Sequence, residues 1–332
     1  MKNLGMAVVG CGFVGRGAHV PALASLQNAE LVAVADADDA RLSKVVKKYE
    51  VPAGYADYRQ LLEDPHVDAV VIALPTSMHA QASIAAMQAG KHVLCEMPLA
   101  ANLEEVEQMI DVAKKQGVCL MPGLTFRFTP NFVKVKEMIA QGAIGNPTAA
   151  LYREFIPAQD LARQWPPGAW VWNLEESGGP LYTLAVWSID LVQWLLDSPI
   201  QTVQAAAKYT KLDRFGGTLG YDASAALQFA NGLVGCLQFS GSVVPAAAGS
   251  ALEIVGDTPG VLCATDNDRV TLYADQPEKT QWNVKESGPG MWGHLQQDQY
   301  FADCLCQGRT PDITPNDGRR AMEIAMQIAK PS

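Results

Sequence analysis

Three glycines near the N-terminus have the spacing of a phosphate-binding turn. The turn contains Gly10, Gly12, Phe13, Val14 and Gly15. It follows an apolar run at residues 4–9, which predicts a strand buried on both faces. A strand that ends in such a turn brings backbone N–H groups and a helix N-terminus to one point. The pattern alone is weak, but in the right context it predicts a pyrophosphate site.

Asp36 supplies that context. It lies 21 positions beyond Gly15, at the end of the second predicted strand, Glu30–Ala35. A carboxylate there can accept hydrogen bonds from the ribose hydroxyls of an adenosine, although a turn followed by a helix-capping aspartate would look similar. The same carboxylate would repel a 2′-phosphate, which favours NAD over NADP. Arg41, one turn into the next helix, could reach back, so NADP remains an alternative.

Strands and helices alternate through the first part of the chain. Predicted strands cover residues 4–9, 30–35, 68–74, 92–95 and 118–121, and predicted helices cover 15–26, 38–49, 77–89 and 103–116. Such alternation requires a parallel sheet covered on both faces. We therefore expect an α/β fold whose first domain, residues 1–124, is a doubly wound Rossmann sheet.

The sequence changes character near Thr125. Residues 159–179 are rich in tryptophan and proline, which predicts a long loop. The apolar pattern of Leu181–Leu196 predicts a deeply buried helix. Strands without intervening helices follow, at 201–211, 223–230, 233–240, 251–256, 261–264 and 269–273. They predict an α+β second domain, residues 125–332, with an open and largely antiparallel sheet. Two closing helices, His294–Cys306 and Asp317–Lys330, could pack back on the first domain.

Composition excludes several classes of protein. The chain has 332 residues, of which 48% are hydrophobic and 18% charged, and its net charge is −10. That charge argues against nucleic-acid binding and against an anionic membrane surface. The N-terminus leaves no room for a signal peptide, and no apolar run reaches transmembrane length. The seven cysteines form no C-x-x-C pair, so we expect reduced thiols, a cytoplasmic protein and no metal site.

Short stretches spread over almost the whole chain follow one known pattern. They are Val9–Gly15, Val71–Thr76, Gly90–Ala100, Arg127–Phe128, Gly178–Pro180 and Trp194–Leu196. In these stretches the chain resembles the glucose–fructose oxidoreductase, inositol dehydrogenase and MocA (Gfo/Idh/MocA) family. The resemblance implies a nicotinamide-dependent enzyme whose second domain carries the substrate pocket and an oligomer contact. It also implies a cofactor pocket that includes Leu74, Pro75, Thr76, His79, Glu96 and Met97.

Three positions depart from the family pattern. Met97 stands where the family has a lysine, and Thr183 and Trp187 stand where it has an aspartate and a histidine four residues later. In the family these residues carry the acid–base chemistry. None of the three side chains here titrates near neutral pH. Catalysis by Met97, Thr183 and Trp187 is therefore doubtful.

Other residues could contact a substrate. They are Arg127, Tyr152, Trp165 and Asp190. Asp190 shares a helix face with Thr183, and alternation along a strand sends Tyr152 and Glu154 to one face. For each of them an ordinary structural role, such as an aspartate bonded to a nearby arginine, is at least as good an interpretation.

The sequence supports one function and leaves alternatives open. The first interpretation is an NAD(P)-dependent oxidoreductase that moves a hydride between nicotinamide and a sugar or polyol, with unusual acid–base groups. The second is a catalytically inactive regulator that binds cofactor or sugar, and a hydrolase or lyase on the same fold is a third. In each case we expect a sugar-like ligand and a homo-oligomer, a dimer or a tetramer, built through the second sheet.

Overall fold

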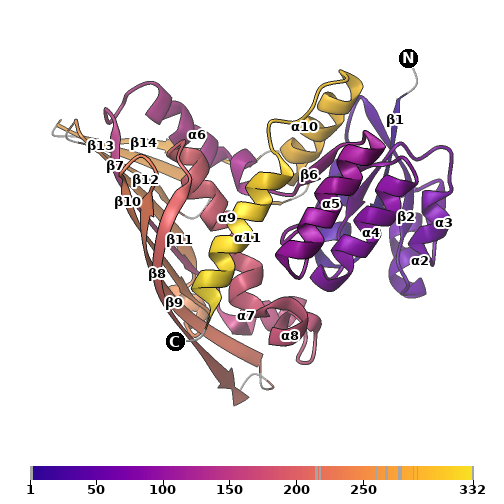
Figure 1. Ribbon diagram of the computed structural model, residues 1–332, viewed down its shortest axis with the longest axis horizontal. Helices are drawn as coiled ribbons and strands as arrows, with labels where there is room; N and C mark the ends of the chain where they lie inside the picture. The colour runs from indigo at the N-terminus through magenta and orange to yellow at the C-terminus, as the bar shows by residue number, and fades with distance from the viewer. Residues whose placement is uncertain are drawn as a thin grey trace. The chain divides into compact units, whose positions relative to one another are not determined.

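The computed structural model describes residues 3–213, 216, 218–258, 260–265, 268–275, 279–286, 288–289 and 291–330. The chain divides into two compact units. The first unit comprises Met1–Thr125 and Ser287–Arg319, and the second comprises Phe126–Glu286 and Arg320–Ser332. Figure 1 shows the course of the chain through both.

The first unit contains a six-stranded parallel sheet. Its strands are β1 (Leu4–Val9), β2 (Ala29–Ala35), β3 (Ala53–Tyr55), β4 (Ala69–Ile72), β5 (His92–Cys95) and β6 (Leu120–Pro122). They lie in the order β3-β2-β1-β4-β5-β6, which confirms the predicted Rossmann sheet. The side chains of β1 from Met6 to Val9 are fully buried, as strands covered on both faces require. The carboxyl ends of the strands share one edge, where the glycine turn and Asp36 lie.

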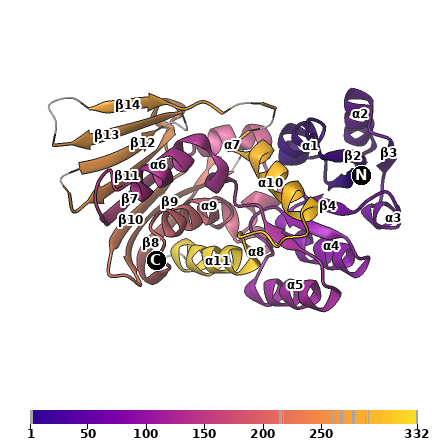
Figure 2. The ribbon, with the colours of Figure 1, turned by 90° about the horizontal axis from the view of Figure 1, so that it is seen from above.

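Helices cover both faces of this sheet (Figure 2). They are the π-helical turn η1 (Gly15–His19), α1 (Val20–Leu23), α2 (Asp39–Tyr49), α3 (Tyr58–Leu62), α4 (Thr76–Gln88), α5 (Leu103–Gln116) and α10 (His294–Cys306). The first helix ends at Leu23 rather than near Leu26, because Ser25 turns its hydroxyl back to the carbonyl of Ala22 and the chain tightens. Cys304 is buried and Cys306 exposed, so the two do face different sides of α10.

The second unit is built on an eight-stranded sheet. Its strands are β7 (Pro147–Phe155), β8 (Ile200–Leu212), β9 (Thr218–Phe229), β10 (Val234–Ser240), β11 (Gly249–Gly256), β12 (Gly260–Thr265), β13 (Arg269–Ala274) and β14 (Thr280–Asn283). Their order is β14-β13-β12-β11-β7-β10-β9-β8. Among the described strands of this second sheet, only β7 and β10 pair in parallel, so the predicted largely antiparallel sheet is confirmed. The sequence did not predict β14.

Helices cover one face of the large sheet, where its buried side chains lie (Figure 1). They are η2 (Thr125–Phe128), α6 (Pro130–Ala140), α7 (Ala158–Gln164), η3 (Trp170–Trp172), α8 (Leu174–Ser177), α9 (Gly179–Leu195) and α11 (Pro315–Ala329), with a short turn η5 (Pro245–Ala247) between strands. Part of the predicted loop at 159–179 is therefore helical, because Asn173 caps α8 by accepting from the N–H groups of Glu175 and Glu176. Among the described residues, none of the helices is both long and apolar enough to cross a membrane.

Candidate functional site

The three glycines of the turn after β1 have two different roles, close internal packing and open space for a ligand. Gly10 has a φ of +102°, and a Cβ there would lie 2.4 Å from the carbonyl oxygen of Ala73. A Cβ on Gly15 would lie 1.8 Å from the carbonyl oxygen of Gly10, so these two glycines are required by packing inside the protein. A Cβ on Gly12 would meet no atom within 4 Å. Gly12 thus borders open space at a helix N-terminus, which fits a pyrophosphate approaching the backbone.

Asp36 is held against the turn. Its carboxylate accepts hydrogen bonds from the backbone N–H of Cys11 at 2.8 Å and of Asp38 at 2.8 Å. The Arg41 guanidinium reaches back to the same carboxylate at 3.2 Å. A carboxylate has about four acceptor positions, so capacity for a ribose hydroxyl remains. Arg41 has the position that the sequence suggested for it.

The turn after β4 contains one polar atom that fits a ligand. The Thr76 side chain is buried, and its hydroxyl has no hydrogen-bond partner among the residues that the structure describes. It follows Leu74 and Pro75 at the start of α4, on the edge that carries the glycine turn. Buried hydroxyls normally form a hydrogen bond. A Thr76 hydroxyl without one at this edge is therefore consistent with a hydrogen bond to a bound cofactor.

His79 has a structural role. Its ring nitrogens lie 2.8 Å from the carbonyl oxygen of Pro98 and 2.7 Å from that of Leu74. The side chain therefore ties the turn after β4 to the turn after β5. Burial lowers the pKa of this imidazole, so His79 holds no charge for catalysis at neutral pH.

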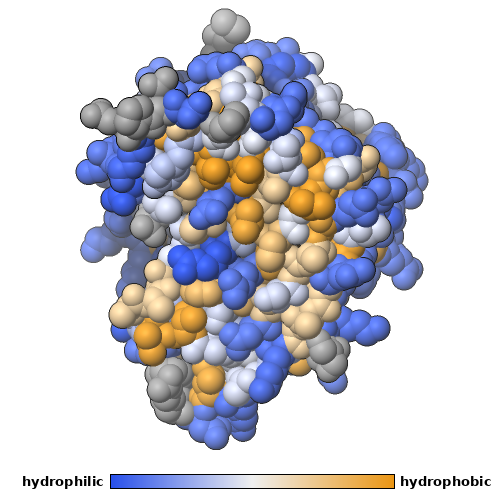
Figure 3. Space-filling model, turned by 90° about the vertical axis from the view of Figure 1, so that its left-hand side faces the viewer, coloured by the Kyte–Doolittle hydropathy of each residue, from blue (hydrophilic) through white to orange (hydrophobic). Residues whose placement is uncertain are grey.

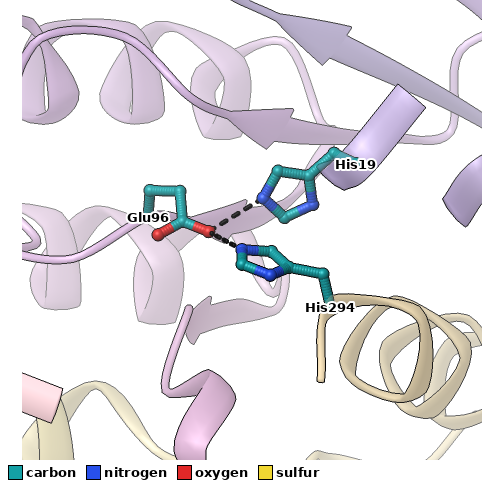
Figure 4. A group of neighbouring side chains, drawn as sticks. All are labelled: His19, Glu96 and His294. Atoms are coloured by element: carbon teal, nitrogen blue, oxygen red, sulfur yellow. Dashed lines mark hydrogen bonds and ion pairs between the residues drawn. The ribbon is translucent and has the colours of Figure 1, made fainter. Parts of the chain in front are cut away.

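A buried polar cluster follows β5 (Figure 4). The Glu96 carboxylate lies 2.8 Å from the Nε2 atom of His19 and 3.1 Å from the Nε2 atom of His294. The Nδ1 atom of His19 lies 2.9 Å from Asp298. Met97 is buried beside the cluster, and its backbone N–H donates to Glu96 at 3.3 Å. The sequence named Glu96 and Met97 but missed His19, His294 and Asp298.

The pKa values in this cluster are strongly shifted. Burial alone would lower the pKa of His19, but the charge and hydrogen bond of Asp298, helped by Glu96, raise it to about 10. Burial alone would raise the pKa of Glu96, but hydrogen bonds from His19 and His294 hold it well below its usual range. When protons alone hold the cluster together, Glu96 is therefore a carboxylate and His19 an imidazolium at neutral pH.

In the second unit, Arg127 and Asp190 form a bidentate ion pair. The Arg127 Nε atom donates to one Asp190 oxygen at 2.8 Å, and a terminal nitrogen donates to the other at 2.6 Å. The Asp190 side chain is 2% exposed and that of Arg127 13%. The pair joins η2 to the middle of α9, and its geometry is that of a structural clamp.

Thr183 and Trp187, which the resemblance aligns with an aspartate and a histidine, both lie on α9. Thr183 is buried, and its hydroxyl donates to the carbonyl of Gly179 at 3.0 Å, one turn earlier. Trp187 lies one turn beyond Thr183 and is half-buried. Trp165, the last of the proposed pocket residues, is also half-buried and makes an edge-on contact with Trp170 at 6.3 Å between ring centres.

Tyr152 and Glu154 lie on the buried face of β7, as their alternation predicted. The Tyr152 hydroxyl donates to one Glu154 oxygen at 3.5 Å, and the hydroxyl of Ser188 on α9 donates to the other at 2.8 Å. Burial raises the pKa of Glu154 to about 7, against the smaller opposing effect of these hydroxyls. Tyr152 itself has a pKa raised well above its usual value by burial, so it stays neutral.

We expect Glu154→Gln to stabilise the protein at pH 8 and not at pH 4. Because the folded pKa of Glu154 is raised, its stabilising contribution is complete below about pH 4.5 and is lost as the pH rises through 7. Removing the buried charge should add roughly 1–3 kcal/mol to the free energy of unfolding at pH 8. Urea unfolding at both pH values measures this. Glu253→Gln, which changes an exposed carboxylate on the neighbouring strand β11, is the control, and an equal gain there would contradict the argument.

Comparisons with known proteins agree with this architecture. The model of the oxidoreductase family with an NAD-binding Rossmann fold matches residues 4–124, and that of the GFO/IDH/MocA C-terminal domain matches residues 132–261. A myo-inositol 2-dehydrogenase of Thermotoga maritima is 32% identical over 332 residues, which cover 98% of this chain and 95% of the relative. A scyllo-inositol 2-dehydrogenase (NAD(+)) of Bacillus subtilis is 26% identical over 324 residues, covering 96% and 91%.

One solved structure, that of a probable dehydrogenase from Thermotoga maritima, superposes with a TM-score of 0.81 at 27% identity, covering 98% of this chain and 95% of that one. Models of both domains of one family therefore match this chain, and a solved structure shares its fold over almost the whole length. The chain belongs to the Gfo/Idh/MocA family of oxidoreductases.

Proposed function

We propose that this oxidoreductase transfers a hydride between NAD and a CH–OH carbon of a cyclic polyol or sugar. The observation that carries the proposal is the edge of the first sheet, where the open side of Gly12, the unpaired Thr76 hydroxyl and Asp36 lie together. Gly12 would meet the pyrophosphate and Asp36 the adenosine ribose. Bound NAD supplies the hydride chemistry, while the chain orients the reactants. The substrate class rests on relatives named as inositol dehydrogenases.

We propose NAD rather than NADP as the preferred cofactor. The carboxylate of Asp36 would repel a 2′-phosphate, and Arg41 is already paired with that carboxylate. Arg41 is nearly half exposed, so it can swing outward, and some use of NADP is expected. A relative whose name specifies NAD(+) supports the same preference.

The proton that is released or taken up with the hydride cannot move through the side chains that the family pattern uses. Met97, Thr183 and Trp187 offer no group that titrates near neutral pH. We propose that solvent, or a hydroxyl of the ligand itself, takes this role. Proton transfer by a placed side chain is worth about 10²–10⁴-fold, so turnover should be slow and not absent. A half-buried indole at position 187 also suits stacking on a sugar ring, which keeps a sugar-binding regulator as the second candidate.

The experiment is a turnover panel with a binding control. Purified protein is mixed with NAD+ or NADP+ and with inositols, aldoses and sugar acids, and the absorbance of reduced nicotinamide is followed. Gly12→Ala is the matched variant, because its Cβ enters open space and should leave the fold intact. We expect that variant to weaken NAD binding by roughly 10–100-fold, the effect of crowding a packed contact by 1–3 kcal/mol. Tight NAD binding without turnover on any substrate would overturn the enzyme and favour the regulator.

We further propose that the protein forms a homo-oligomer through the outer face of the large sheet and works in the cytoplasm, where its free thiols stay reduced. Figure 3 looks onto that face and shows hydrophobic side chains gathered on it. Leu151 on β7 is 44% exposed and lies beside Cys236 on β10, where Val234 is 56% exposed. Apolar side chains on an open sheet face suit a second copy of the chain.

We expect light scattering to give a mass that is a multiple of the chain mass. Leu151→Lys should lower that mass, because it places a charge in the middle of the apolar face. Gln60→Lys, at an exposed position on α3 of the first unit, should leave it unchanged. A monomeric wild-type protein would contradict the proposal.

A further inference from the structure

All four ring nitrogens of two buried histidines face oxygen acceptors. In His19, Nδ1 faces the carboxylate of Asp298 and Nε2 faces Glu96. In His294, Nδ1 faces the carbonyl oxygen of Met291 and Nε2 faces the same Glu96 oxygen. The side chains of His19, His294 and Glu96 are 0%, 3% and 7% exposed, so these contacts are made in the interior of the first unit.

A neutral imidazole has one N–H group and one lone pair. If each Nδ1 carries the hydrogen, it can donate to Asp298 or to the Met291 carbonyl. Each Nε2 then presents its lone pair toward the same oxygen atom of Glu96 (Figure 4). Two nitrogens and one carboxylate oxygen are thus three electron-pair donors gathered within 4.8 Å of one another.

We infer that His19, His294 and Glu96 form a binding site for one divalent transition-metal ion of the zinc type. Their donor atoms all lie within 4.8 Å of one another. Zinc binds imidazole nitrogen and carboxylate oxygen at about 2.0–2.2 Å, which separates tetrahedral ligands by about 3.3 Å. The two distances to the Glu96 oxygen, 2.8 Å and 3.1 Å, are already close to that separation. A bound ion would draw the two imidazole nitrogens toward the same separation from each other.

The surroundings of the three ligands have the form that metal sites use. A ligating histidine normally donates its other ring N–H to a carboxylate or a backbone carbonyl, which fixes the tautomer and the ring orientation. Asp298 does this for His19, and the Met291 carbonyl does it for His294. Two histidines and one carboxylate leave a fourth position open, as in catalytic rather than structural zinc sites.

The alternative is a cluster held together by protons alone. In that arrangement both imidazoles are charged and balance the two carboxylates, and the cluster only stabilises the fold. The metal arrangement also balances the charge, because one divalent ion neutralises Glu96 and Asp298. It would place positive charge directly before Met97, the position at which the family pattern has a lysine. This inference does not rest on the proposed function, because the contacts among the three ligands are made without a bound cofactor.

The test is binding of Zn²⁺ to chelator-treated protein, measured by calorimetry and by metal content after desalting. Exposed thiols also bind zinc, so all measurements use the background Cys236→Ser, Cys306→Ser. We expect one ion per chain. His294→Gln should lose binding at least about 100-fold, and Asp298→Asn should lose about 10–100-fold by releasing the ring of His19. His66→Gln, which removes an exposed histidine, should bind as the background does.

Co²⁺ provides a second measurement that depends on neither activity nor affinity. Bound in the proposed site it should show the intense visible absorption of four-coordinate cobalt, and His294→Gln should abolish this signal while circular dichroism reports a folded chain. No stoichiometric Zn²⁺ binding by the background protein would overturn the proposal. Equal binding by His294→Gln and His66→Gln would also overturn it.

Discussion

Restoring the three family residues together, as Met97→Lys, Thr183→Asp and Trp187→His, is expected to raise polyol turnover by about 10²–10⁴-fold. That is the usual contribution of a placed proton-transfer group. Two of the positions share a helix face, because Thr183 and Trp187 lie one turn apart on α9. A histidine at 187 would have an aspartate one turn earlier to orient it. Initial rates with NAD and an inositol, before and after the change, give the ratio.

The local structure tolerates these changes to different degrees. Met97 is buried, and its side chain has about the length of a lysine, so this substitution changes little volume but places a charge in the interior. Thr183 is buried and bonded to Gly179, so an aspartate there is the most demanding of the three. Trp187 is half-buried, and replacing it by histidine removes volume. The triple variant should therefore be less stable than the wild type, and its melting temperature must be measured beside its rate.

The single variants and the pH profile separate chemistry from packing. Trp187→His alone lacks the orienting aspartate and should gain much less than the triple variant. The triple variant should also acquire a rate that rises with pH around the pKa of a histidine, which the wild type lacks. A folded triple variant without added activity would show that positions 97, 183 and 187 do not share the reaction site.

Most of the cofactor edge could be predicted from sequence because its determinants are local. The glycine turn, the strand before it and Asp36 lie within 36 consecutive residues, and each is fixed by backbone conformation or strand periodicity. The structure adds the neighbours of each glycine, which strand periodicity does not reveal. Gly10 and Gly15 serve internal packing, and Gly12 alone borders open space. That distinction depends on the neighbouring β4 turn, which the sequence does not place.

The buried cluster around Glu96 could not be predicted, for a physical reason. His19 and Glu96 are 77 residues apart, and His19 and Asp298 are 279 residues apart. The return of α10 to the first unit brings them together, and no local pattern encodes such a return. The sequence does place His19 one turn into the helix, four positions after Gly15. It does not show which residues contact the His19 side chain. The helical turns within 159–179 were missed because capping by Asn173 outweighs the turn-forming composition of that stretch.

Asp190→Asn is expected to destabilise the protein by about 3–5 kcal/mol. The change removes the charge that Arg127 faces with two nitrogens, at 2.8 Å and 2.6 Å, and so takes this counter-charge away from a largely buried guanidinium. Breaking one side of a buried ion pair has an effect of this size, whereas an exposed pair contributes about 0–1 kcal/mol. The free energy of unfolding in urea measures the difference.

A matched control lies in the same unit. Glu137 pairs with Lys134 at 3.4 Å and is 53% exposed, so Glu137→Gln makes the same chemical change on the surface. It should alter the free energy of unfolding by less than about 1 kcal/mol. The double variant Arg127→Met, Asp190→Leu should recover much of the stability that Asp190→Asn loses, because it removes both buried charges together. If Asp190→Asn stays as stable as the wild type while the KM for substrate rises, Asp190 acts on the ligand and the clamp is not its main role.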